Sequence, residues 1–233
     1  MIGIITAMKI ESDTLRASMQ NVKEEKVCAF TFFTGTLCSK DVVLCVSGVG
    51  KVNSAACTQA LIMKYSLDMI INIGVAGSAS KLLGVGDFVI GESYFQFDVD
   101  TSPIGDPKYM ISGINKIFID SKKSLVEEAL NCAKNKFPML HVYSGKIGSS
   151  DKFIGGENAY LRDVASDIGA MCVDMESGSI AQVAYINNVD FVAVRTISDS
   201  ADGDAPASFA DFCSDSAKRA EEWICEFLVS VNL

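Results

Sequence analysis

Several residue types are scarce in this chain of 233 residues, and each scarcity excludes a class of protein. His141 is the only histidine and no CxxC pair occurs, so a CxxC metal or redox site is absent. Ser-His or Cys-His nucleophilic catalysis would need His141, which lies in the apolar run MLHVYSG and is interpreted as a core or strand-edge residue. Only four prolines are present, and no repeat or low-complexity tract marks a linker. We therefore expect one α/β domain over residues 1–233.

Positive charge is also scarce. The 20 Lys and Arg residues are scattered and outnumbered by 29 Asp and Glu, for a net charge of −9, so neither a nucleic acid nor an anionic membrane is expected as a partner. No apolar run approaches the ~20 residues of a membrane span. The opening MIGIITAMKIESD lacks a basic leader, so we expect no signal peptide. The eight cysteines show no paired short spacing, which favours reduced thiols in a cytoplasmic protein.

What the chain does have is a regular alternation of apolar runs and helical patterns. Strands are predicted at 2–8, 29–37, 42–50, 69–77, 88–97, 140–148, 170–175 and 191–198. Helices are predicted at 11–21, 52–66, 120–136, 156–168, 177–187 and 207–231. The pattern indicates a layered α/β fold with a central, largely parallel sheet, made mixed by a hairpin between the second and third strands. Segment 98–119 is expected to be an ordered loop.

Polar residues follow several of these strands directly. Ligands of open α/β sheets bind outside the carboxyl ends of the strands, which is where Glu11, Glu176 and Asp199 fall. Each acid alone could be a helix first-turn residue or a turn cap. Arg195 lies inside the apolar strand VAVRTIS, and a buried guanidinium needs a partner. Their joint occurrence at strand ends favours a functional site.

Two glycine-rich turns also follow strands. SGVGK (47–51) lacks the first glycine and the Ser or Thr of a P-loop, and NIGVAGS (72–78) does not fit GxGxxG. We interpret both as tight turns that let the backbone approach a ligand, which places Val75, Ala76 and Gly77 at the site.

Taken together, these segments resemble one family. GIITAMKIE, SGVGKVNSA, NIGVAGS, GVGDFVI, SSDKFI, VDMES and VRTISDSAD occur in the order seen in the 5′-methylthioadenosine/S-adenosylhomocysteine nucleosidases, members of the nucleoside phosphorylase superfamily. The resemblance runs from residue 2 to about 231. It implies a three-layer α/β/α sandwich, a homodimer, and hydrolysis of the N-glycosidic bond of a 5′-substituted adenosine without a metal or other cofactor.

The resemblance also implies roles for four residues. Asp199 would protonate adenine at N7, and Glu11 would bind the attacking water and act as base. Glu176 would hold the ribose hydroxyls and stabilise a cationic ribosyl centre, and Arg195 would help position the water and hold Glu176. This fits the chemistry, because cleavage builds positive charge on the sugar and negative charge on the base.

The resemblance further implies a substrate pocket. Phe153 would stack on adenine, and Ile154 would offer it backbone hydrogen bonds. The complete set of expected binding residues is Met8, Val75, Ala76, Gly77, Phe153, Ile154, Met175, Ser198 and Phe209. Without the resemblance, the aromatic and methionine side chains would be interpreted as ordinary core. The chain departs from the usual pattern at Ile73, Val75 and Phe97, and in segment 98–119.

Three functions are consistent with these residues. The first is a hydrolase of 5′-methylthioadenosine, S-adenosylhomocysteine or a related substrate such as 5′-deoxyadenosine. The second is a phosphorylase of the same superfamily. Phosphate needs cationic clamps, however, and of the four arginines only Arg195 falls at a strand end. The third is a nucleoside-binding protein without catalysis, against which the presence of all three acids speaks.

Overall fold

The structure is a computed structural model. It describes residues 1–201 and 205–231, except for the side chains of 205–211, 213 and 214. Its strands form a single ten-stranded sheet. They are β1 (Ile2–Thr6), β2 (Gln20–Val27), β3 (Phe30–Leu37), β4 (Lys40–Val46), β5 (Met69–Ser78), β6 (Phe88–Gln96), β7 (Ile119–Asp120), β8 (Val142–Ser149), β9 (Ala170–Asp174) and β10 (Asp190–Asp199).

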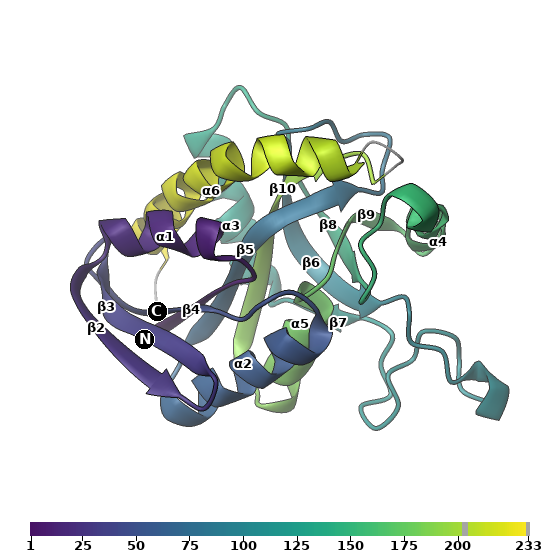
Figure 1. Cartoon of the computed structure of the whole chain (residues 1–233), viewed down its shortest axis with the longest axis horizontal. Coiled ribbons are helices and arrows are strands. Elements are labelled where there is room, and N and C mark those ends of the chain that lie inside the picture. Colours follow the sequence, from purple (N-terminus) through teal and green to yellow (C-terminus); the bar gives the residue numbers. More distant parts are fainter. Residues whose placement is uncertain (202–204, 232–233) are drawn as a thin grey trace.

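Helices cover both faces of this sheet. They are α1 (Lys9–Ser18), α2 (Lys51–Lys64), α3 (Lys123–Lys136), α4 (Tyr160–Asp167), α5 (Ser177–Ile186) and α6 (Ala205–Ser230), with short 3₁₀ turns at Ser102–Ile104 and Gly156–Asn158. Helices α1 and α3 pack against α6 on one face, and α2 packs against α5 on the other (Figure 1). The predicted three-layer α/β/α sandwich is confirmed.

The sheet is buried on both faces because consecutive strand residues alternate between two cores. In β1, Ile4 packs toward α6 with Trp223, whereas Ile5 packs toward α2 with Leu61. The side-chain period of a strand is two residues, so a strand buried on both faces reads as a continuous apolar run. This explains why the central strands were recognisable from sequence. Within the part of the chain that is described, no helix has the length and apolarity needed to cross a membrane.

The pairing of the strands is mixed. Parallel pairing joins β4 to β1, β1 to β5 and β5 to β10, and again joins β6 to β8 and β8 to β9. In addition, β10 pairs antiparallel with β6, and β5 pairs antiparallel with β9. The five strands β5, β10, β6, β8 and β9 are therefore paired in a closed circuit. The carboxyl ends of β5, β8, β9 and β10 thereby meet at one rim.

Two strands were missed by the sequence prediction: the two-residue β7, where a loop was expected to end and a helix to begin, and the longer β2. The helix expected at 11–21 ends at Ser18, and Gln20–Val27 forms β2 at the edge of the sheet. Its residues are exposed except for the half-buried Val27, so it has no apolar face to produce a periodic signal. The predicted hairpin between β3 and β4 is present. Its turn residues, Cys38 and Ser39, both have positive φ, as a two-residue hairpin turn requires.

Segment 98–119 is an ordered loop, as expected. It contains the 3₁₀ turn Ser102–Ile104 and an isolated bridge between Ile111 and Lys116. In Figure 1 it extends away from the sheet beyond the end of β6. Phe97, just before it, is buried beside Phe95 and Gly148 and belongs to the core.

Candidate active site

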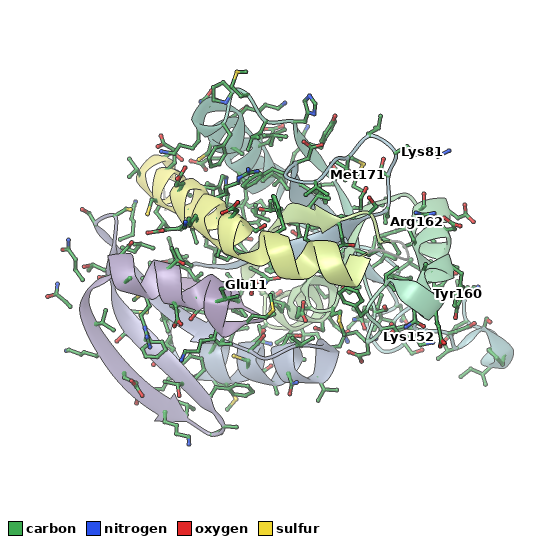
Figure 2. The ribbon with its side chains drawn as sticks, turned by 45° about the horizontal axis from the view of Figure 1, so that its top comes forward. Glu11, Lys81, Lys152, Tyr160, Arg162 and Met171 are labelled. Atoms are coloured by element: carbon green, nitrogen blue, oxygen red, sulfur yellow. The ribbon has the colours of Figure 1, made fainter. Side chains whose placement is uncertain are left out.

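A cavity of about 410 Å³ opens where the carboxyl ends of the strands meet. Its wall comes from the segments that follow β1 and β8 and from the ends of β5, β9 and β10. Figure 2 shows Glu11 at the inner end of α1, below α6, and Lys152 on the segment beside α4. The lining includes twelve of the thirteen predicted site residues: Met8, Glu11, Val75, Ala76, Gly77, Phe153, Ile154, Met175, Glu176, Arg195, Ser198 and Asp199. The side chain of the thirteenth, Phe209, lies outside the described residues.

Glu11 is held by the backbone that precedes its own helix. Its Oε2 accepts hydrogen bonds from the N–H groups of Ala7 at 3.0 Å and Met8 at 2.9 Å, and the Val75 N–H also bonds to the carboxylate. This is the N3 position of α1, where a glutamate commonly reaches back to the N-cap amide. A Cβ placed on Gly74 would lie 3.0 Å from Glu11 Oε1, so the glycine leaves room for the carboxylate.

Glu176 lies between β9 and α5 and is held from the opposite side. Its Oε1 accepts a hydrogen bond of 2.9 Å from the Gly50 N–H at the N-cap of α2. Its own carbonyl oxygen accepts hydrogen bonds from Ser179 N–H and Ile180 N–H, which begin α5. The glycine-rich turn SGVGK therefore binds the Glu176 carboxylate with its backbone, whereas the sequence interpretation expected it to approach a ligand.

Arg195 is 2% exposed, and its bonded carboxylate is Asp174. Its Nε lies 2.9 Å and its Nη2 2.7 Å from Asp174 Oδ2, and the guanidinium also donates to the Asn72 side chain and carbonyl. The sequence interpretation assigned Arg195 to Glu176. In the structure the guanidinium acts on Glu176 through its charge, while its hydrogen bonds go to Asp174, to Asn72 and to the Val194 carbonyl.

Asp174 and Asn72 both line the cavity, and neither was singled out from sequence. Asp174 has a signal that could have found it, because it ends a strand within VDMES, two residues before Glu176. Its carboxylate accepts hydrogen bonds from the Ser149 hydroxyl and from the N–H groups of Glu176 and Ser177. Asn72 lies in the middle of a buried apolar strand, where only its polarity marks it.

Asp199 ends β10 at a β-bulge. Its Oδ2 accepts a hydrogen bond of 2.7 Å from the Ser198 hydroxyl, and its Oδ1 one of 2.8 Å from the Ala201 N–H. Ala201 has a φ of 50°, in the left-handed region that non-glycine residues seldom adopt. The bulge and this turn direct the carboxylate toward the cavity wall formed by Ala76 and Gly77.

Burial raises the pKa of two of these acids. For Glu11 desolvation dominates, opposed by hydrogen bonds from Met8 and by the charge of Arg195. For Glu176 desolvation and the neighbouring Asp174 carboxylate raise the pKa to about 7, against the lowering effect of the Gly50 hydrogen bond. The cavity thus holds two carboxyl groups whose pKa burial raises above the ordinary glutamate value, and a raised carboxyl pKa is typical of groups that act in general acid–base catalysis.

Other residues singled out from the sequence are placed as follows. His141 is exposed, lies 3.5 Å from Asp87, and is outside the cavity lining. Among the described residues, no three His, Cys, Asp or Glu side chains gather as the ligands of a metal ion would. The two departures Ile73 and Val75 both line the cavity. Two further lining residues differ in exposure, since Phe153 is 39% exposed and Ile154 is buried.

Comparison with known proteins gives concordant matches. A family model described as the phosphorylase superfamily matches residues 1–229. A 5′-methylthioadenosine/S-adenosylhomocysteine nucleosidase of Staphylococcus aureus (strain JH9) is 37% identical over 230 residues, which cover 99% of each chain.

Solved structures agree. The 5′-methylthioadenosine/S-adenosylhomocysteine nucleosidase of Neisseria meningitidis, in complex with methylthio-immucillin-A, superposes with a TM-score of 0.93 at 33% identity over 99% of each chain. A futalosine hydrolase mutant of Helicobacter pylori gives a TM-score of 0.91 at 28% identity, again over 99% of each chain.

Proposed function

Because this chain belongs to the phosphorylase superfamily and, within it, to the 5′-methylthioadenosine/S-adenosylhomocysteine nucleosidases, we propose that it hydrolyses the N-glycosidic bond of 5′-substituted adenosines. The products are adenine and the 5′-substituted ribose. Its substrates are 5′-methylthioadenosine and S-adenosylhomocysteine, with 5′-deoxyadenosine as a related candidate.

The observation that carries this function is the convergence of three acids on one cavity. Glu11, Glu176 and Asp199 are far apart in the chain, yet all line the same space of about 410 Å³ and each is less than 8% exposed. A pocket of this size suits a small-molecule ligand. Three acids around an N-glycosidic bond provide both proton transfer to the base and stabilisation of the cationic sugar.

The proposed role of each acid is the one that the family resemblance implies, and the presence of all three acids in one cavity supports it. Asp199 protonates adenine at N7, so that the base leaves neutral. Glu11 accepts a proton from the attacking water, which suits a carboxylate whose pKa burial has raised. Glu176 binds the ribose hydroxyls and stabilises the positive ribosyl centre, while Phe153 stacks on the adenine and Ile154 offers it backbone hydrogen bonds.

Water is the proposed nucleophile because the described residues of the cavity lining form no phosphate clamp. Arg195 already donates to Asp174 and Asn72, so its guanidinium is committed to the protein. Among the described lining residues the other cation is Lys152, on the segment after β8. A single lysine facing several carboxylates is a poor site for a dianion.

The test is a panel of adenosines assayed with and without phosphate. We expect release of adenine from 5′-methylthioadenosine and S-adenosylhomocysteine at the same rate in both conditions. Strict dependence on phosphate would instead establish phosphorolysis, and binding without turnover would establish a nucleoside-binding protein. Asp199→Asn should lower turnover by about 10²- to 10⁴-fold with folding intact.

The panel also includes futalosine, because a futalosine hydrolase is among the structural neighbours. A homodimer in the cytoplasm is proposed on the family resemblance. Sedimentation as a monomer at assay concentrations would count against the dimer.

A further inference from the structure

Three acids stand in a row at the ends of adjacent strands, and only one of them is part of the proposed chemistry. In the parallel register of β6, β8 and β9, Gln96 pairs with Ser149 and Ser149 with Asp174. The residues two positions further along each strand are Asp98, Asp151 and Glu176. Equal offsets from paired residues bring these carboxylates to the same rim of the sheet.

The start of α2 binds all three carboxylates. The Gly50 N–H donates to Glu176 at 2.9 Å, the Lys51 N–H donates to Asp151 Oδ1 at 2.7 Å, and Lys51 Nζ lies 2.5 Å from Asp98 Oδ1. The first N–H groups of a helix lack partners within the helix, and the helix dipole favours negative charge there. One helix end therefore holds the whole row.

The arrangement closes into a ring. Asp98 Oδ2 accepts a hydrogen bond of 2.9 Å from the Asp151 N–H, so Lys51, Asp98 and Asp151 are linked pairwise. The ion pair of Lys51 with Asp98 is only partly shielded from solvent, with side chains 16% and 26% exposed. Gly50 has a φ of 95°, and a Cβ there would lie 3.2 Å from Asp151 Oδ1. The backbone that bonds to Glu176 is thus packed directly on the ring.

Two members of the ring, Lys51 and Asp151, adjoin segments that line the cavity. Asp151 precedes Lys152, Phe153 and Ile154, which line it, and Val49 on the turn before α2 lines it as well. Asp98 begins segment 98–119. The ring therefore joins three separate chain segments, two of which line the cavity.

We propose that Lys51, Asp98 and Asp151 form a positioning unit, which fixes the Gly50 amide against Glu176 and the Phe153–Ile154 segment against the substrate base. The inference rests on the proposed function, since Glu176 and Phe153 are assigned there to ribose and adenine. The three residues do not contact the reacting atoms in this account. They act through Glu176 and Phe153, which are proposed to contact the substrate.

The experiment compares Lys51→Met and Asp98→Asn with Lys64→Met. Lys64 is at the other end of the same helix and also makes a 2.5 Å ion pair, with Glu25 on exposed surface, so it controls for the loss of one lysine and one ion pair on α2. We expect the two ring variants to lose about 10- to 100-fold in kcat/KM at neutral pH, because small displacements of positioned groups are costly. The control should match wild type, and Lys51→Arg should restore most of the activity.

The pH profile distinguishes positioning from mere stabilisation. The Gly50 hydrogen bond lowers the pKa of Glu176, so weakening it raises that pKa. The acid limb of kcat/KM should then move to higher pH in the ring variants and stay in place in Lys64→Met. A lower melting temperature with an unmoved acid limb and unchanged kcat/KM below that temperature would overturn the proposal.

The test does not depend on turnover alone. Hydrogen exchange should show the amides of Gly50 and Lys51 protected in wild type and in Lys64→Met, and unprotected in Asp98→Asn. If the wild type releases no adenine, the proposed function fails. The exchange pattern still shows whether the ring holds the turn at Gly50 and Lys51. Equal protection of both amides in all variants would show that the ring does not hold the turn.

Discussion

The Oδ1 atom of Asp199 lies 2.9 Å from the point that a Cβ on Gly77 would occupy. The same hypothetical Cβ would lie 2.9 Å from the Cβ of Ala201, whose N–H donates to that Oδ1. Gly74 stands in the same relation to Glu11, at 3.0 Å from Oε1. The two glycines of NIGVAGS, Gly74 and Gly77, thus each leave space for the carboxylate of one acid of the site.

Replacing Gly77 with alanine should therefore damage catalysis more than folding. The added methyl group must displace the Asp199 carboxylate or the turn at Ala201, and a misplaced acid transfers its proton poorly. We expect kcat to fall by about 10²-fold, measured as adenine release, with a circular dichroism spectrum like that of the wild type.

Gly84→Ala is the matched control for this variant. A Cβ at Gly84 would meet Asp87 Oδ2 at 3.8 Å, an ordinary contact, and Gly84 does not line the cavity. Its activity should equal that of the wild type. Full activity in Gly77→Ala would show that Asp199 tolerates displacement or does not act as the acid.

The elements that could be predicted from sequence are those in which burial produces a recognisable pattern of apolar residues. The central strands, such as β5, are buried on both faces and read as continuous apolar runs, while α6 shows a helical period. Strand β2 could not be found this way, because an exposed edge strand places no constraint on side-chain polarity. Strand β2 is defined by its backbone pairing with β3 at the edge of the sheet, which leaves no periodic pattern in its own sequence.

The site shows the same division. Glu11, Glu176 and Asp199 were identifiable because each lies at the end of a strand or within five residues after it. The partner of Arg195 was not, because several carboxylates lie near the same rim and only the pairing of β5 with both β10 and β9 brings Asp174 to Arg195. The register of these pairs is set by packing across the whole sheet, and no local spacing in the sequence encodes it.

The buried pair of Asp174 and Arg195 should be a major source of stability against single substitution. Asp174→Asn leaves a guanidinium 2% exposed without its charged partner, so we expect the free energy of unfolding to fall by about 3–5 kcal/mol. Urea denaturation measures this. Asp163→Asn is the control, since Asp163 is 73% exposed and its pair with Arg162 should contribute at most about 1 kcal/mol. Similar losses in both variants would contradict the prediction.

Glu176 should make the protein less stable as the pH rises. Its pKa is about 7 in the folded protein against 4.5 for the ordinary side chain, so the folded state binds more protons between these values. Stability then decreases as pH increases through this window, the reverse of a salt-bridged acid. Glu176→Gln removes the effect, and we expect it to gain on the order of 2 kcal/mol at pH 8 and little at pH 4.5.

Melting temperatures of both proteins across this range provide the measurement. The curves of wild type and Glu176→Gln should converge at low pH and separate above neutrality. The same variant should lose nucleosidase activity, because in the proposed mechanism the ionised carboxylate binds the ribose hydroxyls and stabilises the ribosyl centre. A variant that is less stable than wild type at pH 8 would show that the hydrogen bond from Gly50 outweighs desolvation.

The rate of adenine release should fall on the acid side at an unusually high pH. Glu11 must be ionised to accept a proton from water, and burial raises its pKa, while Glu176 is also protonated below about pH 7. The acid limb of kcat/KM should therefore lie well above the ordinary glutamate value and report both groups together. Glu11→Gln keeps an oxygen for the Ala7 and Met8 amides but removes the base, so its rate should drop by about 10²- to 10⁴-fold. Glu127→Gln, on the exposed face of α3, is the control and should follow the wild-type profile. An acid limb near pH 4.5 in the wild type would mean that substrate binding returns both carboxylates to a solvated environment, and would remove burial as the reason for their reactivity.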